Sequence, residues 1–187
     1  MLRRRSRDNA MQDRLVWQAA SLMSPSRTRR GHADRLQKAA RLLDHVTGEP
    51  RALLGETVVG LSVRRPMELQ QEYVETFDLH KRCTMLLTYW TSGDTRNRGA
   101  DMVEFTQAYR AAGVEIPKHE APDHLPVVLE FAATVNPDAG RALLTKYRVP
   151  IGVVARALAT GNHPTRRCSR QWTRPCRRRR PSTMCRA

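Results

Sequence analysis

The sequence predicts an all-α fold, and three observations support that prediction. Apolar residues recur at spacings of three and four along the chain, whereas the alternation of apolar and polar residues typical of β-strands is nearly absent. The glycines lie singly where helices are expected to end. No internal repeat of fixed period indicates a solenoid. We therefore expect one compact domain of about six to eight helices over residues 11–161 of the 187-residue chain.

Three helices are expected before residue 65. The second should stop before Gly48 and Pro50. Gly55 and Gly60 lie inside the third and lower its intrinsic helix propensity. The apolar stripes that predict them are Leu15, Ala19, Leu22 and Met23 for the first, Leu36, Ala40, Leu43 and Val46 for the second, and Leu53, Leu54, Val58 and Leu61 for the third.

The next segment begins at Pro66, a residue that fits the first turn of a helix. Tyr73 and Phe77 stand four apart on one helical face. Leu79 lies about 200° around the helix from Phe77, and the apolar stripe then resumes toward Trp90. Two interpretations remain open: one helix buried on two faces, or a break near Asp78.

Helix caps organise the second half of the sequence. Gly93 is expected to end a helix and Asp94 to cap the next one. Residues 114–122 are expected to form a loop, after which Asp123 caps a helix. Asn136-Pro137 is a cap followed by a first-turn proline. The stripes of these helices are Met102, Phe105, Tyr109 and Ala112, then Leu125, Val128, Leu129 and Ala132, then Ala139, Ala142, Leu143 and Tyr147, with a last short segment from Ile151 to Leu158.

The chain carries a formal net charge of +15, and this excess lies at its two ends. Residues 1–30 hold eight Arg against two Asp, and residues 163–187 hold nine Arg and no acid, whereas residues 31–162 hold sixteen bases and sixteen acids. We expect a basic N-terminal extension over residues 1–10 and a disordered tail over residues 162–187, because the tail has too few apolar residues to offset its ordering entropy.

Two further interpretations of the tail stay open. An arginine-rich arm that binds nucleic acid predicts retardation of DNA or RNA with steep salt dependence, lost on deletion of residues 163–187. The composition also matches what GC-rich coding DNA yields out of frame, so the tail is a candidate frameshift product. An intact mass that matches all 187 residues would exclude a sequencing artefact.

No apolar run approaches the roughly 18 to 20 residues that span a bilayer, and the N-terminus lacks the apolar stretch of a signal peptide. We therefore expect a cytoplasmic protein with no transmembrane segment. Cys168, Cys176 and Cys185 follow each other at spacings of eight and nine, which match no metal or redox pair. Cys83 lies alone in an apolar pattern and is expected to be a buried thiol rather than a nucleophile.

The sequence offers little for catalysis, and we expect neither an enzyme nor a bound metal or cofactor. No phosphate loop, dinucleotide fingerprint or nucleophile elbow occurs. His119 and His124 suggest a metal site, but Pro122 keeps them off one helix face, so a solvated loop is the better interpretation. Asp78 and His80 suggest an acid and base, but no third group is fixed beside them.

Peptide binding is the remaining interpretation, because the aromatic residues are concentrated in the middle of the chain. Tyr73 and Tyr89 are the best candidates for partial exposure, since a phenol hydroxyl needs a polar partner. Glu72 and Glu75 flank Tyr73 and would offer negative charge to a basic peptide. Seven aromatic residues fall within one 59-residue stretch: Tyr73, Phe77, Tyr89, Trp90, Phe105, Tyr109 and Phe131.

Several motifs of this region resemble a known family. They are Tyr73-Val74-Glu75-Thr76-Phe77-Asp78, then Leu87-Thr88-Tyr89, then Gly93-Asp94-Thr95-Arg96 with Arg98-Gly99, and then Pro122-Asp123-His124-Leu125. In this order and spacing they resemble the delta-subunit family of respiratory nitrate reductase assembly chaperones (NarJ-type), which is related to the TorD-like chaperones of molybdenum oxidoreductases. The resemblance runs from about Glu72 to Tyr147.

The resemblance implies a compact, TorD-like helical protein without catalytic activity. It implies a cytoplasmic factor that binds the N-terminal peptide of the apo nitrate reductase alpha subunit and holds that subunit open for its molybdenum cofactor. Asp94 and Asp123 are expected to be helix caps first and ligands second. The candidate peptide-binding residues are Tyr73, Glu75, Phe77, Asp78, Tyr89, Arg96, Arg98, Asp123, His124 and Glu130.

The chain departs from the family pattern at two places. An arginine-rich stretch runs from Met23 to Gly31 where the family has a Tyr-Pro turn, and the pattern fades beyond Tyr147. A missing final helix would leave apolar surface uncovered, so self-association is also expected.

Overall fold

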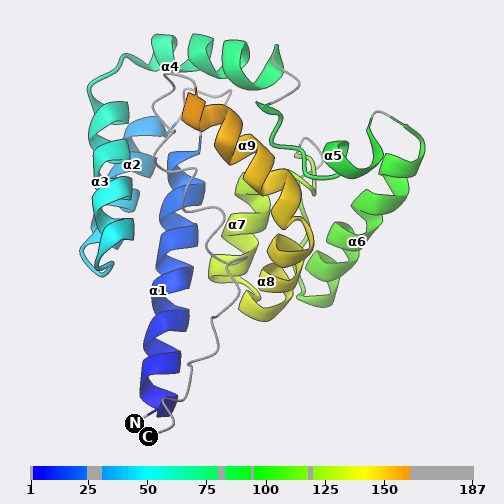
Figure 1. Cartoon of the computed structure of the whole chain (residues 1–187), viewed down its shortest axis with the longest axis horizontal. Helices are drawn as coiled ribbons and strands as arrows, with labels where there is room; N and C mark the ends of the chain where they lie inside the picture. Colours follow the sequence, from blue (N-terminus) through cyan, green and yellow to red (C-terminus); the bar gives the residue numbers. More distant parts are fainter. Residues whose placement is uncertain (1, 25–30, 80–82, 94, 118–119, 161–187) are drawn as a thin grey trace, which may run out of the picture.

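A computed structural model describes residues 2–24, 31–79, 83–93, 95–117 and 120–160. Within these ranges the all-α prediction is confirmed: they form nine α-helices and one π-helical turn, and no strand (Figure 1). The helices outnumber the expected six to eight because the segment from Pro66 to Trp90 is divided into short pieces. The elements are α1 (Leu2–Met23), α2 (His32–Leu43), α3 (Glu49–Ser62), α4 (Pro66–Tyr73), the π-helical turn η1 (Val74–Asp78), α5 (Tyr89–Ser92), α6 (Asn97–Ala111), α7 (Leu125–Thr134), α8 (Pro137–Lys146) and α9 (Arg148–Thr160).

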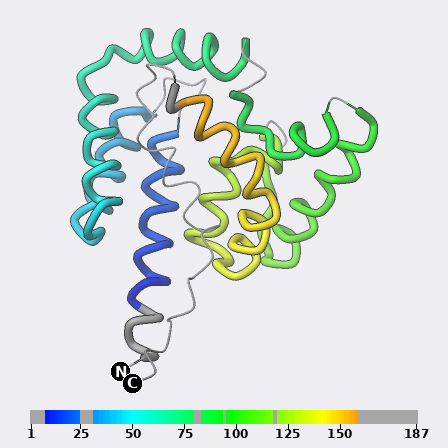
Figure 2. The backbone as a smooth tube through the Cα atoms, viewed as in Figure 1, coloured from blue at the N-terminus to red at the C-terminus, as the bar shows by residue number. Residues whose placement is uncertain are grey.

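The long helix α1 lies at the centre of the fold. It packs against α2 and α3 on one side and against α7 on the other, and α7 in turn packs against α8. Figure 2 shows α4 crossing above the ends of α1, α2 and α3, while α6 lies at the far side of the molecule. The site motifs therefore occupy the top and the α6 side of a scaffold built around α1.

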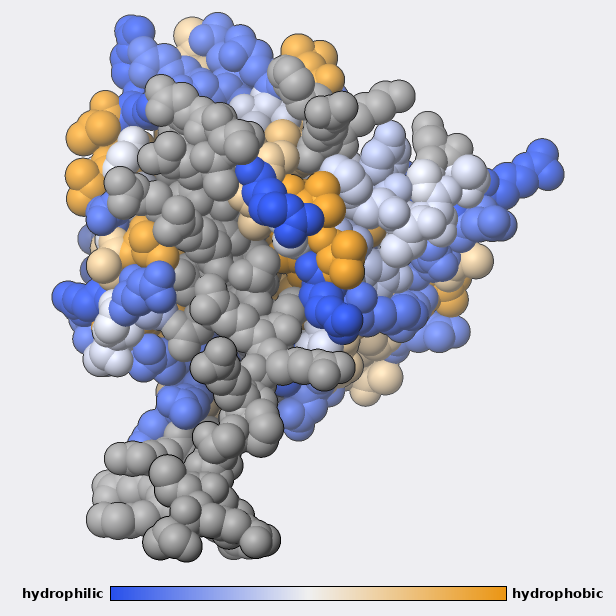
Figure 3. Space-filling view, in the orientation of Figure 1, coloured by the Kyte–Doolittle hydropathy of each residue, from blue (hydrophilic) through white to orange (hydrophobic). Residues whose placement is uncertain are grey.

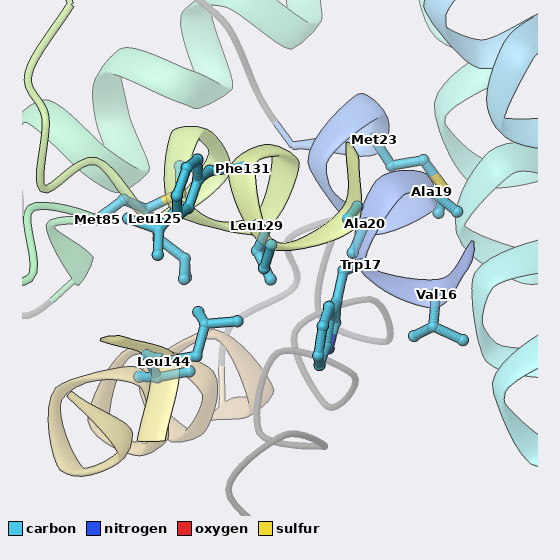
Figure 4. Close-up of a cluster of buried hydrophobic side chains, with 14 of the residues drawn as sticks. Val16, Trp17, Ala19, Ala20, Met23, Met85, Leu125, Leu129, Phe131 and Leu144 are labelled. Carbon is cyan, nitrogen blue, oxygen red and sulfur yellow. The ribbon is translucent and has the colours of Figure 1, made fainter. Parts of the chain in front are cut away.

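The core forms where α1, α7 and α8 meet (Figure 4). Trp17 is fully buried there, and the Arg141 guanidinium lies over its ring, 4.9 Å from the ring centroid. The same guanidinium is 3.0 Å from the carboxylate of Asp13. Ala19 and Met23 are buried as expected, but Leu15 and Leu22 are only half-buried. The buried face is wider than the predicted stripe because α1 is covered from two sides.

Arginine side chains of the helical body satisfy the carbonyls at helix C-termini. Arg35 donates to the carbonyls of Leu22 at 3.1 Å and Ser24 at 2.6 Å, at the end of α1. Arg14 donates from Nε to the carbonyl of Ala133 at 2.8 Å, at the end of α7. The last carbonyls of a helix lack intrahelical donors and carry partial negative charge, so a guanidinium there is stabilising. These arginines have a structural role in the fold.

The local cap predictions have mixed outcomes. Asn136 caps α8, with its Oδ1 accepting from the Ala139 amide at 3.0 Å, and Gly93 ends α5 with a φ of 60°. The prediction that Asp123 caps a helix is wrong: α7 begins after His124, and no side chain caps it. The Asp123 side chain is instead fully buried. The predicted cap Asp94 lies outside the described residues.

Other predictions also fall outside the described residues. These are the Arg-rich stretch at residues 25–30, the tail at residues 162–187 with its cysteines, and the side chains of His80 and His119. Among the helices that are described, none has the length and apolar character needed to cross a bilayer.

Candidate functional site

The motif Tyr-Val-Glu-Thr-Phe-Asp folds into a rare backbone conformation. It continues α4 as the π-helical turn η1, in which the amide of Leu79 donates to the carbonyl of Val74 at 2.9 Å, five residues back. Of the two interpretations of this segment, the break near Asp78 is therefore confirmed. Single π-turns inside helices frequently mark functional sites. This makes η1 the first part of the candidate site.

One face of this segment is anchored in the core. Tyr73 and Phe77 are buried, and their ring centroids lie 5.3 Å apart. The expectation that Tyr73 is partly exposed is wrong: the residue is 8% exposed, and its ring packs on the same inward side as that of Phe77. Two of the candidate residues thus hold the segment in place, while the side chains between them are presented outward.

The opposite face of the segment is exposed and combines apolar with acidic side chains. Met67 is 54% exposed, Val74 38% and Leu79 69%, and the carboxylates of Glu75 and Asp78 are exposed beside them. Exposed apolar side chains that cluster on one element are a feature of interaction surfaces. We call this surface the α4–η1 face and define it as Met67, Gln71, Val74, Glu75, Asp78 and Leu79.

The ionised side chains of this segment are all acidic. Residues 66–79 contain four carboxylates and neither Lys nor Arg. Two of the carboxylates have cationic partners at the start of the segment: Arg64 pairs with Glu72, and Arg65 Nε donates to Glu68 at 2.7 Å. The Arg65 hydrogen bonds lower the pKa of Glu68. Glu75 and Asp78 follow toward the η1 end of the segment, and both residues are exposed.

A second group of motif residues forms a buried polar cluster. Asp123 Oδ2 accepts hydrogen bonds from the Thr88 hydroxyl at 2.6 Å and the Thr88 amide at 3.1 Å. Both residues are 0% exposed. Arg98 donates to the Thr88 hydroxyl at 3.2 Å, and its guanidinium is 3.7 Å from Asp123. Three motifs far apart in the sequence are therefore tied together by one carboxylate, which is why Asp123 does not cap α7.

Backbone pairing reinforces this cluster. Leu86 and His124 form an isolated antiparallel bridge, with the Leu125 amide donating to the Met85 carbonyl at 2.9 Å. The Tyr109 hydroxyl donates to the Pro122 carbonyl at 2.8 Å, and burial, followed by the charge of Asp123, raises the pKa of Tyr109 so that it remains a neutral donor. The cluster clamps the segment before α5 onto the start of α7.

The remaining candidate residues are divided between these regions. Tyr89 is half-buried at the start of α5, and its ring meets that of Trp90 edge-on. Arg96 is exposed immediately before α6, whereas Glu130 is exposed on α7. The ten candidates thus do not form one contiguous patch. The candidate residues of η1 and the candidate residues around Asp123 lie in two different regions of the fold. The sequence alone did not distinguish these two regions.

A pocket of about 750 Å³, which was not predicted from the sequence, lies between α2, α3 and the start of α4. Its walls are mainly apolar, and they include Leu36 and Ala40 from α2 and Val58 and Leu61 from α3. The Nε2 atom of His32, which also lines the pocket, is buried and has no hydrogen-bond partner among the residues that the structure describes. These residues belong to the apolar stripes of ordinary amphipathic helices, so no sequence motif predicts the pocket.

The environment of His32 predicts a pH-dependent stability. Burial, and then the positive charge of Arg35, lower the pKa of the imidazole, while Asp34 and Arg64 line the same pocket. The folded state therefore binds fewer protons than the unfolded state near the unfolded pKa of about 6.5, so the free energy of unfolding falls as the pH drops through that value. We expect lower stability at about pH 5 than at neutral pH, and a shallower dependence in His32→Gln. Urea denaturation of both proteins measures this, and equal slopes would assign the dependence to another group.

Catalytic interpretations gain no support from the described residues. Among them, no group of three or more His, Cys, Asp or Glu side chains is arranged to hold a metal ion. Cys83 is half-buried, and burial raises the pKa of its thiol, which disfavours the thiolate that a nucleophile needs.

Comparison with known proteins agrees with the motif resemblance. Residues 36–154 match the family described as "Nitrate reductase delta subunit". The chain belongs to this family. The matched delta-subunit region contains both the π-turn and the Asp123 cluster.

Two relatives of this delta-subunit chain match different shares of it. It is 49% identical over 150 residues to the nitrate reductase-like protein NarX of Mycobacterium tuberculosis, across 80% of this chain and 22% of NarX. It is 30% identical over 102 residues to the nitrate reductase molybdenum cofactor assembly chaperone NarJ of Escherichia coli K-12, across 54% of this chain and 43% of NarJ. The chain thus spans under half the length of each of these two relatives.

A crystal structure from Archaeoglobus fulgidus, described as a redox enzyme maturation protein, shares the fold. The TM-score is 0.62 at 22% sequence identity, and the match covers 87% of this chain and 91% of that one. At this identity the likeness establishes the helical architecture of the delta-subunit chain and no more.

Proposed function

We propose that this chain is an assembly chaperone of respiratory nitrate reductase. It binds the N-terminal peptide of the apo catalytic alpha subunit in the cytoplasm and keeps that subunit open while the molybdenum cofactor is inserted, with no catalysis of its own. Family membership and the chaperone NarJ of E. coli support the general role. The observation that carries the peptide-binding mode is the family motif folded as a π-turn beneath an exposed apolar and acidic face.

The α4–η1 face has the chemistry that an amphipathic, basic peptide requires. Apolar anchors of a helical peptide pack against exposed apolar side chains, here Met67, Val74 and Leu79. Rim charges set register and association rate more than affinity, and Glu75 and Asp78 supply the sign that attracts Lys and Arg. We expect a dissociation constant of about 1 μM or tighter, or about −8 kcal/mol.

Neutralising the acidic end of the face should weaken binding. We expect Glu75→Gln/Asp78→Asn to raise the dissociation constant for the alpha-subunit peptide by about threefold to tenfold, because an exposed ion pair contributes about 0.2 to 1 kcal/mol. Added salt should reduce wild-type affinity toward that of the variant. Isothermal titration calorimetry with a synthetic peptide measures both effects.

The matched control carries the same change of charge elsewhere. Glu115 and Asp138 are exposed and lie outside the α4–η1 face, so Glu115→Gln/Asp138→Asn should bind as the wild type does. Equal losses in the two variants would indicate a general effect of net charge. A folded wild-type protein that does not bind the peptide would exclude the proposed function.

A further inference from the structure

We propose that the pocket between α2 and α3 is a second, apolar subsite for the client peptide. It takes one or two bulky aliphatic or aromatic side chains at one end of the peptide, whose basic residues lie along the α4–η1 face. This inference rests on the proposed function and extends it from an exposed helix face to a defined cavity.

The dimensions and walls of the pocket suit such side chains. Its volume of about 750 Å³ falls within the range of roughly 300 to 1,000 Å³ that is usual for binding cavities. Leu36 and Leu61 are buried at its base, Val58 is half-buried, and Ala40 is an exposed wall residue. An apolar side chain that enters this cavity loses contact with water on most of its surface.

The pocket is continuous with the α4–η1 face. Arg64 and Pro66 line it, and Pro66 is the first residue of α4. Arg64 also pairs with Glu72, so an ion pair joins the pocket edge to the last turn of α4. Figure 1 shows α4 leaving the end of α3 and crossing the top of the molecule. One peptide can therefore occupy the cavity and then follow α4 toward η1.

Apolar surface also surrounds this corner of the protein. Val59 of α3 and Val63, which caps its C-terminus, are exposed, and the next exposed large apolar residue along the chain is Met67 of the α4–η1 face. Apolar atoms are visible at the left edge of Figure 3, over α3. Together with the pocket they form an apolar approach to the acidic η1 end.

The charges indicate which end of the peptide enters the cavity. The ionised side chains at the pocket have partners within the protein: Asp34 lies 2.7 Å from Lys38, and Arg64 pairs with Glu72. The pocket thus has one acidic and one basic ionised wall residue, whereas residues 66–79 of the α4–η1 segment hold four carboxylates and neither Lys nor Arg. Apolar side chains fit the former and Lys or Arg the latter.

His32 adds a polar requirement. Its buried Nε2 atom finds no hydrogen-bond partner in the described part of the chain, and an unsatisfied buried polar atom favours a ligand that supplies one. A peptide amide or a Ser or Thr hydroxyl next to the apolar anchor would meet that need. A purely hydrocarbon ligand would not meet it.

Blocking the pocket from its exposed wall tests the proposal. Ala40 is exposed and lines the pocket, so Ala40→Trp should fill the cavity without removing a core side chain. Ala52 is an equally exposed helical alanine of α3 outside the pocket, and Ala52→Trp is the matched control. We expect Ala40→Trp to weaken binding of the alpha-subunit peptide by at least about tenfold and Ala52→Trp to leave it unchanged.

The outcomes separate this inference from the proposed function. If wild type, Ala40→Trp and Ala52→Trp bind the peptide equally, the chaperone proposal stands and the pocket proposal is overturned. If the folded wild type binds no peptide, both fail. Sedimentation velocity identifies a different occupant: a wild-type dimer that Ala40→Trp alone makes monomeric would show that the pocket receives a second copy of this chain, which also overturns the proposal.

Discussion

Replacing Asp123 by alanine is expected to lower the free energy of unfolding by about 3 kcal/mol. The carboxylate accepts two hydrogen bonds from Thr88, and bonds to a charged acceptor contribute about 1.5 to 3 kcal/mol each. Alanine would also leave the buried Thr88 amide without an acceptor. Arg98 limits the effect because its guanidinium is 21% exposed and water can solvate it after the change. Urea denaturation followed by circular dichroism measures the difference.

Two further variants separate the contributions within this cluster. Asp123→Asn keeps an acceptor oxygen and should cost only about 1 kcal/mol. Thr88→Val removes the hydroxyl and preserves the shape, so a double-mutant cycle with Asp123→Ala isolates the hydroxyl–carboxylate bond. Additive effects of Asp123→Ala and Thr88→Val would mean that the 2.6 Å contact does not couple the two motifs.

The cluster also shows why local sequence signals mislead at this position. Asp123 stands before a helix and has the residue type of an N-cap, but its carboxylate is bound by Thr88, which is 35 residues away in the sequence. Asn136 has the same local signal and does cap its helix, with no comparable competing partner in the described contacts. The cap prediction depends on local geometry and fails where a long-range buried partner offers stronger bonds.

The site could be predicted in part. The motif around Tyr73 can be singled out from the sequence, since aromatic spacing and family resemblance are properties of the sequence, and its role in binding stays a prediction. Its π-turn could not, because a hydrogen bond five residues back depends on how Tyr73 and Phe77 pack in the core. The pocket between α2 and α3 arises only from the way in which these two helices and the start of α4 are placed relative to one another. The periodicity of apolar residues does not encode the spacing between helices.

Replacing Gly140 by alanine should be the most damaging single-methyl change in the described fold. Gly140 lies in α8 and is buried against α7, where a Cβ atom would come within 3.0 Å of the backbone and side chain of Ala132. Ala132 is fully buried, so the two helices must separate to make room. Overpacking of this kind costs about 1 to 3 kcal/mol, and contact with backbone atoms places this site at the upper end. We expect a loss of about 2 to 3 kcal/mol, or roughly 5 to 10 °C in the melting temperature.

The same substitution at Gly55 provides a control of opposite sign. Gly55 lies in α3, and no atom would meet a new Cβ within 4 Å, so Gly55→Ala should stabilise the protein by about 0.5 to 1 kcal/mol through helix propensity alone. If Gly140→Ala instead stabilised the protein, as Gly55→Ala is expected to do, the argument from the close approach of Ala132 would be wrong. Because α7 also begins directly after the Asp123 cluster, displacement of α7 by Gly140→Ala should disturb that cluster. Tryptophan fluorescence of Trp90, whose Nε1 donates to the Thr84 carbonyl at 3.1 Å beside the clamped segment, would report that displacement.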